Sequence, residues 1–134
     1  MGQNNLSAGE WSVTEGRDNT AIGTASHAEG YNTTAAGYAH SEGYETKASG
    51  SFSHAEGCRT EAVGSYSHAE GGYKWNATDG PLTKKGVEIF GSRAQGQYSH
   101  AENYRTLAYG NNSHAEGEET VASGKDSHAE GFQT

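Results

Sequence analysis

The sequence of 134 residues contains one cysteine, one proline and no long apolar run. A disulfide framework within one chain is excluded because Cys58 has no second cysteine to pair with. The N-terminal segment MGQNNLSAGEW lacks the apolar region of a signal peptide, and no stretch approaches the roughly 20 apolar residues of a membrane span. We therefore expect no membrane insertion within this chain.

Basic residues are also scarce. Nine Lys and Arg residues stand against 17 Asp and Glu residues, and only Lys84 and Lys85 are adjacent, so we expect no nucleic-acid partner. The apolar fraction of 31%, the 20 glycines and a mean hydropathy of -0.90 would ordinarily indicate disorder. Composition does not decide the fold here, because the sequence is repetitive.

Two short motifs alternate along the chain. The first is SHAEG, at 26–30, 53–57, 67–71, 113–117 and 127–131, with the near copies AHSEG at 39–43 and SHAEN at 99–103. The second is Ser/Thr-x-Ala-x-Gly, at 33–37, 46–50, 60–64, 92–96, 106–110 and 120–124. Copies of the first motif usually recur every 14 residues, so the underlying period is about seven residues with two alternating types.

Glycine at every seventh residue, without an apolar heptad seam, excludes a coiled coil and favours β-strands. Because side chains alternate along a strand, Ser/Thr, Ala and Gly share an inner face, and the intervening residues point outward. We expect each Gly and the two residues after it to form a turn, with the Gly at positive φ and Asn103 as its substitute. Two strands and two turns give one 14-residue coil, and coils stacked at about 4.8 Å form a single all-β domain over 1–134.

The two outward faces of this parallel roll differ. Pairs on one face vary freely, such as Lys47 with Ser49 and Leu107 with Tyr109, so that face is expected to meet solvent. The other face repeats one pair in every coil, which predicts a constant environment, most simply another copy of the chain. A core with two alanines per coil buries little apolar area, which also favours oligomerisation. The predicted seam comprises His27, Glu29, His40, Glu42, His54, Glu56, His68, Glu70, His100, Glu102, His114, Glu116, His128 and Glu130.

The histidines and glutamates do not form a predicted catalytic site. A zinc deaminase would need a Pro-Cys-x-x-Cys element, which one cysteine cannot supply. Ser26 and His27 are neighbours and lie on opposite faces of a strand, which prevents a proton relay from serine to histidine. The glutamates form a uniform row, so no carboxylate has a distinct environment in which it could act as acid while its neighbour acts as base. We predict no enzyme activity, no cofactor and no metal, with His–Glu hydrogen bonds holding the seam. Such an assembly should loosen as the pH falls through about 6.

The tandem pattern, as in NTAIGTASHAEG at 19–30, resembles the head repeats of trimeric autotransporter adhesins of the Yersinia adhesin type. Its His/Glu version is similar to repeats in phage tail fibres and prophage surface proteins. This resemblance implies a left-handed parallel β-roll, a homotrimer around a common axis, and an extracellular role, on a virion tail or a bacterial surface, in attachment to a cell. The chain departs from the family pattern in two ways. The outward pair of residues is apolar in the adhesin heads, but here an apolar residue remains there mainly at Ile22, and no stalk follows the repeats. Because it stops within a repeat at GFQT, we expect a fragment of a longer fibre.

One segment, 72–91, interrupts the repeats, which resume in phase after it, so the rod is expected to continue beneath it. Asp79-Gly80 is a hairpin turn signal within this insertion. One interpretation is a projecting loop that binds a host-surface glycan or protein through Tyr73, Trp75, Lys84 and Lys85. The other is a hairpin that packs on a neighbouring chain, with Trp75 and Phe90 buried.

Two rows of aromatic residues are expected at the turns, and turn packing is favoured over sugar binding: Tyr31, Tyr44, Tyr104 and Phe132 in one row, and Phe52, Tyr66 and Tyr98 in the other. The predicted function is a structural and adhesive module of a trimeric surface fibre. The alternative is a solenoid that binds metal through the His/Glu rows or ice through its threonines. Ice binding is disfavoured because the threonine row should point inward.

Overall fold

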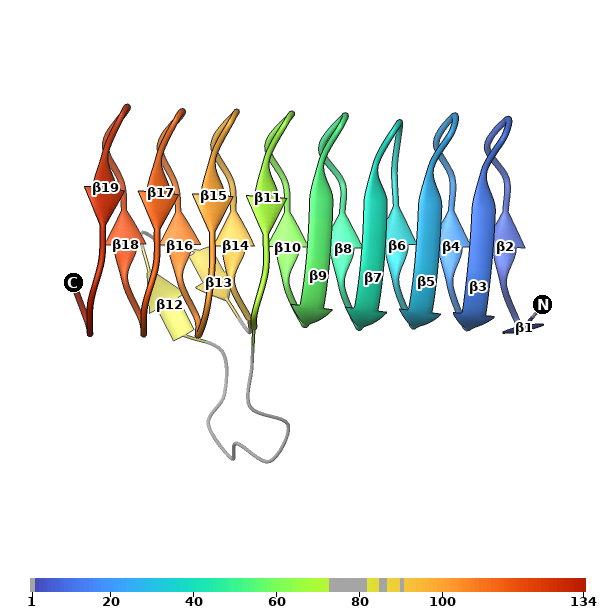
Figure 1. The fold of residues 1–134 in the computed structure, drawn as a ribbon, viewed down its shortest axis with the longest axis horizontal. Helices are drawn as coiled ribbons and strands as arrows, with labels where there is room; N and C mark the ends of the chain where they lie inside the picture. Colours follow the sequence, from blue (N-terminus) through green and yellow to red (C-terminus); the bar gives the residue numbers. More distant parts are fainter. Residues whose placement is uncertain (1, 73–81, 85–86, 90) are drawn as a thin grey trace.

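The computed structural model describes residues 2–72, 82–84, 87–89 and 91–134 as a parallel β-solenoid (Figure 1). Successive coils lie side by side along the long axis, and each contributes one short strand to each of two sheets. The odd-numbered strands form a nine-stranded sheet: β1 (Gly2–Gln3), β3 (Val13–Arg17), β5 (His27–Tyr31), β7 (His40–Tyr44), β9 (His54–Cys58), β11 (His68–Ala69), β15 (His100–Ala101), β17 (His114–Ala115) and β19 (His128–Ala129).

The second sheet has eight parallel strands and carries the Ser/Thr-x-Ala-x-Gly repeats: β2 (Leu6–Ser7), β4 (Thr20–Ala21), β6 (Thr34–Ala35), β8 (Lys47–Ala48), β10 (Glu61–Ala62), β14 (Arg93–Ala94), β16 (Leu107–Ala108) and β18 (Val121–Ala122). A separate antiparallel pair consists of β12 (Leu82–Lys84) and β13 (Val87–Ile89). The all-β fold with 14-residue coils predicted from the repeats is confirmed. None of the described residues forms a helix of the length and hydrophobicity that crossing a membrane requires.

Strand register follows the motif alignment even where the spacing changes. His27 pairs with His40 across the one 13-residue step, because the turn at Gly37 is a residue shorter than its neighbours. Across the insertion, His68 pairs with His100 and Glu61 pairs with Arg93. The prediction that the rod continues through the interruption is therefore confirmed.

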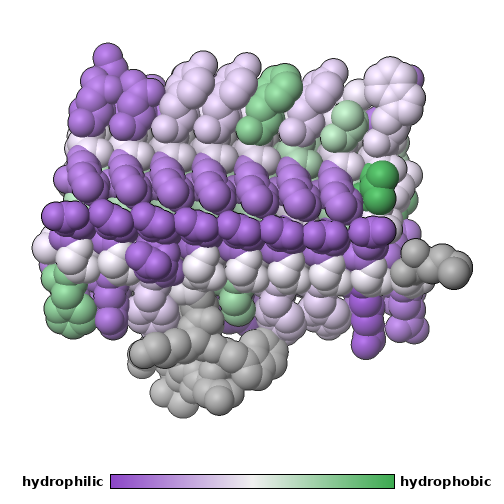
Figure 2. All heavy atoms as spheres, in the orientation of Figure 1, coloured by the Kyte–Doolittle hydropathy of each residue, from purple (hydrophilic) through white to green (hydrophobic). Residues whose placement is uncertain are grey.

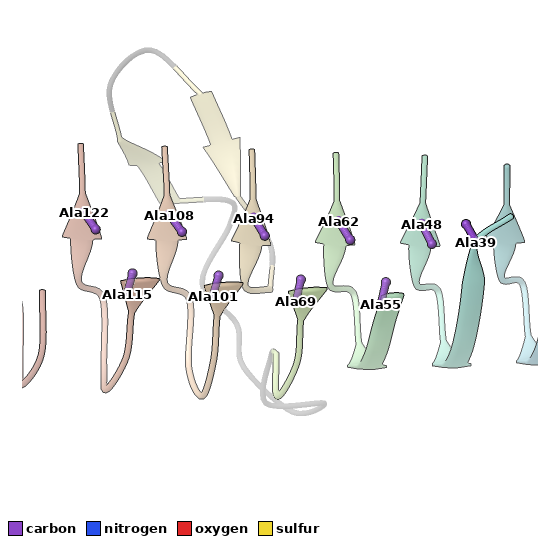
Figure 3. Close-up of a cluster of buried hydrophobic side chains, with 10 residues drawn as sticks. All are labelled: Ala39, Ala48, Ala55, Ala62, Ala69, Ala94, Ala101, Ala108, Ala115 and Ala122. Carbon is purple, nitrogen blue, oxygen red and sulfur yellow. The ribbon is translucent and has the colours of Figure 1, made fainter. Parts of the chain in front are cut away.

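The interior is lined by alanine. Ala48, Ala62 and Ala94 from one sheet and Ala55 and Ala69 from the other are fully buried, and the side chains of the two sheets point toward one another (Figure 3). A methyl group is the largest side chain that most of these positions hold, because the two sheets of one narrow coil face each other directly. The predicted alternation of inner and outer residues is thus confirmed.

Buried hydroxyl groups complete the core by bonding to turn carbonyls. The serine of SHAEG donates to the glycine oxygen three residues earlier, as Ser67 Oγ does to Gly64 at 2.6 Å. In four of the five copies of the other motif that begin with threonine, the threonine donates to the glutamate carbonyl four residues earlier, as Thr60 Oγ1 does to Glu56 at 2.9 Å. Burial of these hydroxyl groups therefore costs little free energy, because they are hydrogen-bonded to backbone carbonyls at the turns.

Glycine is required for a different physical reason in each of the two motifs. The prediction of a positive φ is wrong for the glycine of Ser/Thr-x-Ala-x-Gly. In the SHAEG type, Gly30 has a φ of 108°, and its substitute Asn103 has a φ of 76°, as expected. In the other type the positive φ belongs to the second residue after the glycine, for example Phe52 at 59° after Gly50. A Cβ on Gly50 would lie 2.1 Å from the Gly64 oxygen, so this glycine is required by the close approach of adjacent coils.

Candidate functional site

The seven histidines form one continuous stack on the outer face of the nine-stranded sheet. Adjacent imidazole centroids lie 4.8 to 4.9 Å apart, with interplanar angles of 1 to 5°. This spacing follows from the strand separation, because every ring has the same rotamer on successive coils. The stack brings together all seven predicted seam histidines: His27, His40, His54, His68, His100, His114 and His128.

Each histidine reaches diagonally toward the glutamate of the preceding coil. The Nε2–Oε distances range from 3.1 Å for His114 and Glu102 to 3.7 Å for His40 and Glu29. Hydrogen bonds form in two of these pairs, His114–Glu102 and His128–Glu116. The other five Nε2 atoms are buried, and no hydrogen-bond partner for them occurs in the part of the chain that the structure describes.

The His/Glu face is only half covered in a single chain. The His54 and Glu42 side chains expose 36% and 33% of their surfaces. The two rows appear as purple bands along the long axis in Figure 2. A groove of about 480 Å³ follows part of the glutamate row, lined by Glu15, Gly16, Glu29, Gly30, Glu42, Gly43, Glu56 and Gly57.

The electrostatics of the row are most evident at His40. Burial lowers the pKa of its imidazole below the ordinary 6.5, and the neighbouring His54 and His27 lower it further. Glu42 and Glu29 act in the opposite direction with smaller effects. A protonated His40 is therefore disfavoured in the folded chain.

The variable face is half-buried or exposed, with one correction. Lys47 and Ile22 are exposed as predicted, whereas Leu107, predicted to meet solvent, is completely buried. The strands β12 and β13 lie beside β14 and β16 in Figures 1 and 3, and Leu107 is the first residue of β16. Sequence periodicity missed this because it gives the direction of a side chain and not what covers it.

The turn rows hold the expected aromatic residues and one that the sequence comparison missed. Phe52, Tyr66 and Tyr98 stack with centroids 4.9 to 5.1 Å apart, and Tyr38 extends the stack. Tyr38 lies in the shortened turn, so aligning the motifs across that one-residue gap would have found it. These rings are half exposed, but adjacent rings cover one another's faces, which leaves edges for contact with a ligand. Turn packing is the interpretation that the geometry supports.

The threonine row points inward, as predicted. Its buried members are Thr33, Thr46, Thr60, Thr106 and Thr120. This row therefore presents no surface to ice. Ser26 Oγ is likewise occupied at a turn, where it donates to the Gly23 oxygen at 2.7 Å, and it is not paired with His27.

The predicted receptor-binding residues are not brought into a described site. Tyr73, Trp75 and Lys85 lie outside the described residues, as do Phe90 and the Asp79-Gly80 turn signal. Lys84 is the last residue of β12, where its backbone pairs with Val87 of β13. The division into a 1–134 domain with an insertion at 72–91, and the role of that insertion, stay predictions.

Together these features define a class of protein: a parallel β-solenoid of 14-residue coils, built on alanine, with one constant outer face. The family of the YadA head domain repeat matches residues 15–39 in two copies. The match and the solenoid confirm the resemblance to adhesin head repeats. Neither the search of curated proteins nor that of solved structures found a match.

YadA head repeats are structural adhesin modules and not an enzyme family. The repeat that residues 15–39 resemble belongs to a family of adhesin-type surface fibres with an extracellular location. Head domains of this type generally form trimers.

Proposed function

We propose that this chain is a left-handed solenoid module of a homotrimeric surface fibre, with its His/Glu face as the contact between chains. One observation carries the proposal: the outward pair is His and Glu in seven successive coils of the nine-stranded sheet, from β5 to β19, with Val13 and Glu15 in the aligned β3, whereas it changes from coil to coil on the other sheet. A face that contacts an identical partner keeps one chemistry, because each coil meets the same neighbours.

Burial supports the same assignment. The core of the single chain consists almost entirely of alanine, so each coil gains little from the hydrophobic effect. The His and Glu side chains are already packed into regular rows and are about one-third exposed, so a partner that covers them adds contacts at a small cost in side-chain entropy. Stacked imidazoles also give the rigid, flat surface that a repeating contact requires.

Sedimentation of the full chain tests the assembly. Wild-type protein should sediment as a trimer, whereas His68→Trp should yield monomers, since the larger ring projects from the proposed contact. Lys47→Trp makes a similar change at an exposed position of the opposite sheet and should remain trimeric. Circular dichroism establishes that both variants fold. A monomeric wild-type protein, or a trimeric His68→Trp variant, would contradict the proposed seam.

We further propose that the fibre mediates attachment to a cell surface, on a virion tail or a bacterium, by binding a glycan or protein through Tyr73, Trp75, Lys84 and Lys85. The support is the sequence itself: this is the one segment that departs from the repeat, and it concentrates aromatic and basic residues. Binding of the wild-type chain to immobilised glycans and to cells should be lost in a quadruple alanine variant. Unchanged binding by that variant, with its oligomeric state intact, would place attachment elsewhere.

A further inference from the structure

The His/Glu face repeats a set of three metal-ligating atoms. In one such set, Glu56, His68 and Glu70 each offer one atom, and these atoms lie within 4.8 Å of one another. In this set a histidine lies between the carboxylate of the preceding coil and that of its own coil, whereas the first group in the chain combines Glu29 with His27 and His40. Five groups of three are His27, Glu29 and His40; Glu42, His54 and Glu56; Glu56, His68 and Glu70; Glu70, His100 and Glu102; and Glu102, His114 and Glu116, with one more among the described residues.

The distances within these sets suit an ion better than a direct hydrogen bond. His68 Nε2 lies 3.4 Å from Glu56 Oε1, and His54 Nε2 lies 3.5 Å from Glu42 Oε1. Good N–H···O hydrogen bonds are shorter, with a mode near about 2.9 Å. In a tetrahedral site with Zn–N and Zn–O bonds of about 2.0 to 2.1 Å, two ligand atoms lie about 3.3 Å apart. The separation between each of these histidines and the glutamate of the preceding coil is therefore close to that of two ligands in a coordination shell, and the third ligand atom of each set lies within 4.8 Å of the other two.

A second observation is that five imidazole nitrogens make no hydrogen bond to the carboxylates of the preceding coil, which they face at 3.4 to 3.7 Å. The Nε2 atoms of His27, His40, His54, His68 and His100 are buried and lack hydrogen-bond partners among the described residues. Buried polar atoms in folded proteins are usually satisfied, so five equivalent exceptions in one row require a common explanation. The ring stack also fixes each imidazole, so the donor atoms are oriented before any ion arrives.

We propose that the His/Glu face binds Zn²⁺ or a similar divalent transition-metal ion in a row of sites, each formed by one chain. A site formed by Glu56, His68 and Glu70 supplies one imidazole nitrogen and two carboxylate oxygens, and water completes the fourth position. Imidazole with carboxylate favours zinc, nickel or copper over magnesium and calcium, which prefer all-oxygen sites.

Charge sets the occupancy of the row. Each shared glutamate, such as Glu56 or Glu70, belongs to two adjacent groups, and each coil provides one carboxylate on this face. Ions in every coil would be separated by only about 4.8 Å and would exceed the available negative charge. Filling alternate groups gives one divalent ion for two carboxylates. Half of the six groups corresponds to three ions per chain.

Metal counting on the full chain tests the proposal. Protein stripped with EDTA is dialysed against Zn²⁺ and then against metal-free buffer, and bound zinc is measured by mass spectrometry; Co²⁺ provides a visible spectrum of the coordination. We expect about three ions per wild-type chain and a tetrahedral Co²⁺ absorption. The triple variant Glu29→Gln, Glu56→Gln and Glu102→Gln alters all five of the named groups and should retain about one ion.

The matched control removes three carboxylates outside the row, by Glu10→Gln, Glu61→Gln and Glu118→Gln, and should retain three ions. Circular dichroism checks that every variant is folded. Zinc uptake below one ion per chain, no tetrahedral Co²⁺ spectrum, or equal loss in both triple variants would overturn the proposal. Sedimentation of the same samples separates this result from the trimer seam, because a monomer that binds three ions contradicts only the seam, and a trimer that binds none contradicts only the metal row.

Discussion

Serine and threonine residues support the interior at the scale of single side chains. Ser67 Oγ is buried and donates to the Gly64 oxygen at 2.6 Å, and the same bond recurs in most coils. Ser67→Ala should lower the free energy of unfolding by about 1 kcal/mol, because the turn carbonyl loses its hydroxyl donor. Urea denaturation measures this change, with Ser51→Ala at an exposed turn position as the control. Equal effects of the two substitutions would rule out the turn bond as the cause.

Glycines of the second motif are required by the neighbouring coil. A Cβ at Gly64 would lie 2.0 Å from the Gly96 oxygen, whereas a Cβ at Gly37 would meet no atom within 4 Å. Gly64→Ala should therefore destabilise the fold by about 3 kcal/mol through a forced shift of the backbone. Gly37→Ala has the same chemistry without the contact and should be neutral or stabilise by about 0.5 kcal/mol. Urea midpoints that do not separate the two variants would refute the close-approach argument.

His40 gives the fold a dependence on pH. Its pKa is lowered in the folded state from 6.5, first by burial and then by His54 and His27, with Glu42 and Glu29 opposing. The unfolded chain therefore binds the proton more readily, so this contribution to stability is complete above pH 6.5 and is lost as the pH falls below it. Urea unfolding in EDTA should show stability falling from pH 7.5 to 5.5, with a smaller slope in His40→Asn. An equal slope in the variant would show that other groups cause the loss.

At the scale of elements, the insertion is separable from the coil that contains it. Joining Gly72 to Gly91 leaves Gly71, Gly72, Gly91 and Ser92 in the places that 57–60 occupy in the preceding coil, which restores the 14-residue step. Deletion of 73–90 should therefore leave the circular dichroism spectrum of the rod unchanged. The free energy of unfolding should fall by no more than about 2 kcal/mol, the value of exposing one leucine-sized side chain. Loss of the β-signal on deletion would mean that the coil depends on the insertion.

Strands, register and both histidine and glutamate rows were predictable from sequence because each depends only on local alternation and a fixed step. The diagonal approach of His114 to Glu102 was not, since it depends on rotamers. The close contact at Gly50 was also missed, because glycine for a positive φ and glycine for space look identical in a sequence. Leu107 is completely buried although strand alternation places it on the outer face, because alternation gives no information about what covers a side chain.

At the scale of the whole molecule, the two outer faces of the rod differ in their arrangement of charge. The eight-stranded sheet tolerates Lys47, Glu61 and Arg93 in neighbouring coils, with Glu61 and Arg93 forming an ion pair. The His/Glu face concentrates like-charged carboxylates in a chain whose formal net charge is -8. Hydrogen bonds to histidine relieve this repulsion in only two described pairs. Divalent ions would relieve it along the whole row, which makes the stability of the rod depend on its ionic environment.

Zinc should therefore stabilise the folded rod. The proposed donor atoms come from adjacent coils, such as Glu56 and His68, so the site exists only when those coils are stacked. An ion that binds only the folded chain stabilises it by about 2.7 kcal/mol per site at a free concentration 100 times its Kd. Thermal unfolding followed by circular dichroism should show a midpoint that rises with Zn²⁺ concentration and is unaffected by equal Mg²⁺, since magnesium binds imidazole poorly. The Glu29, Glu56 and Glu102 triple glutamine variant should lose most of the zinc-dependent rise. Equal rises with both ions would indicate charge screening of the glutamate row and would contradict coordination by the histidines.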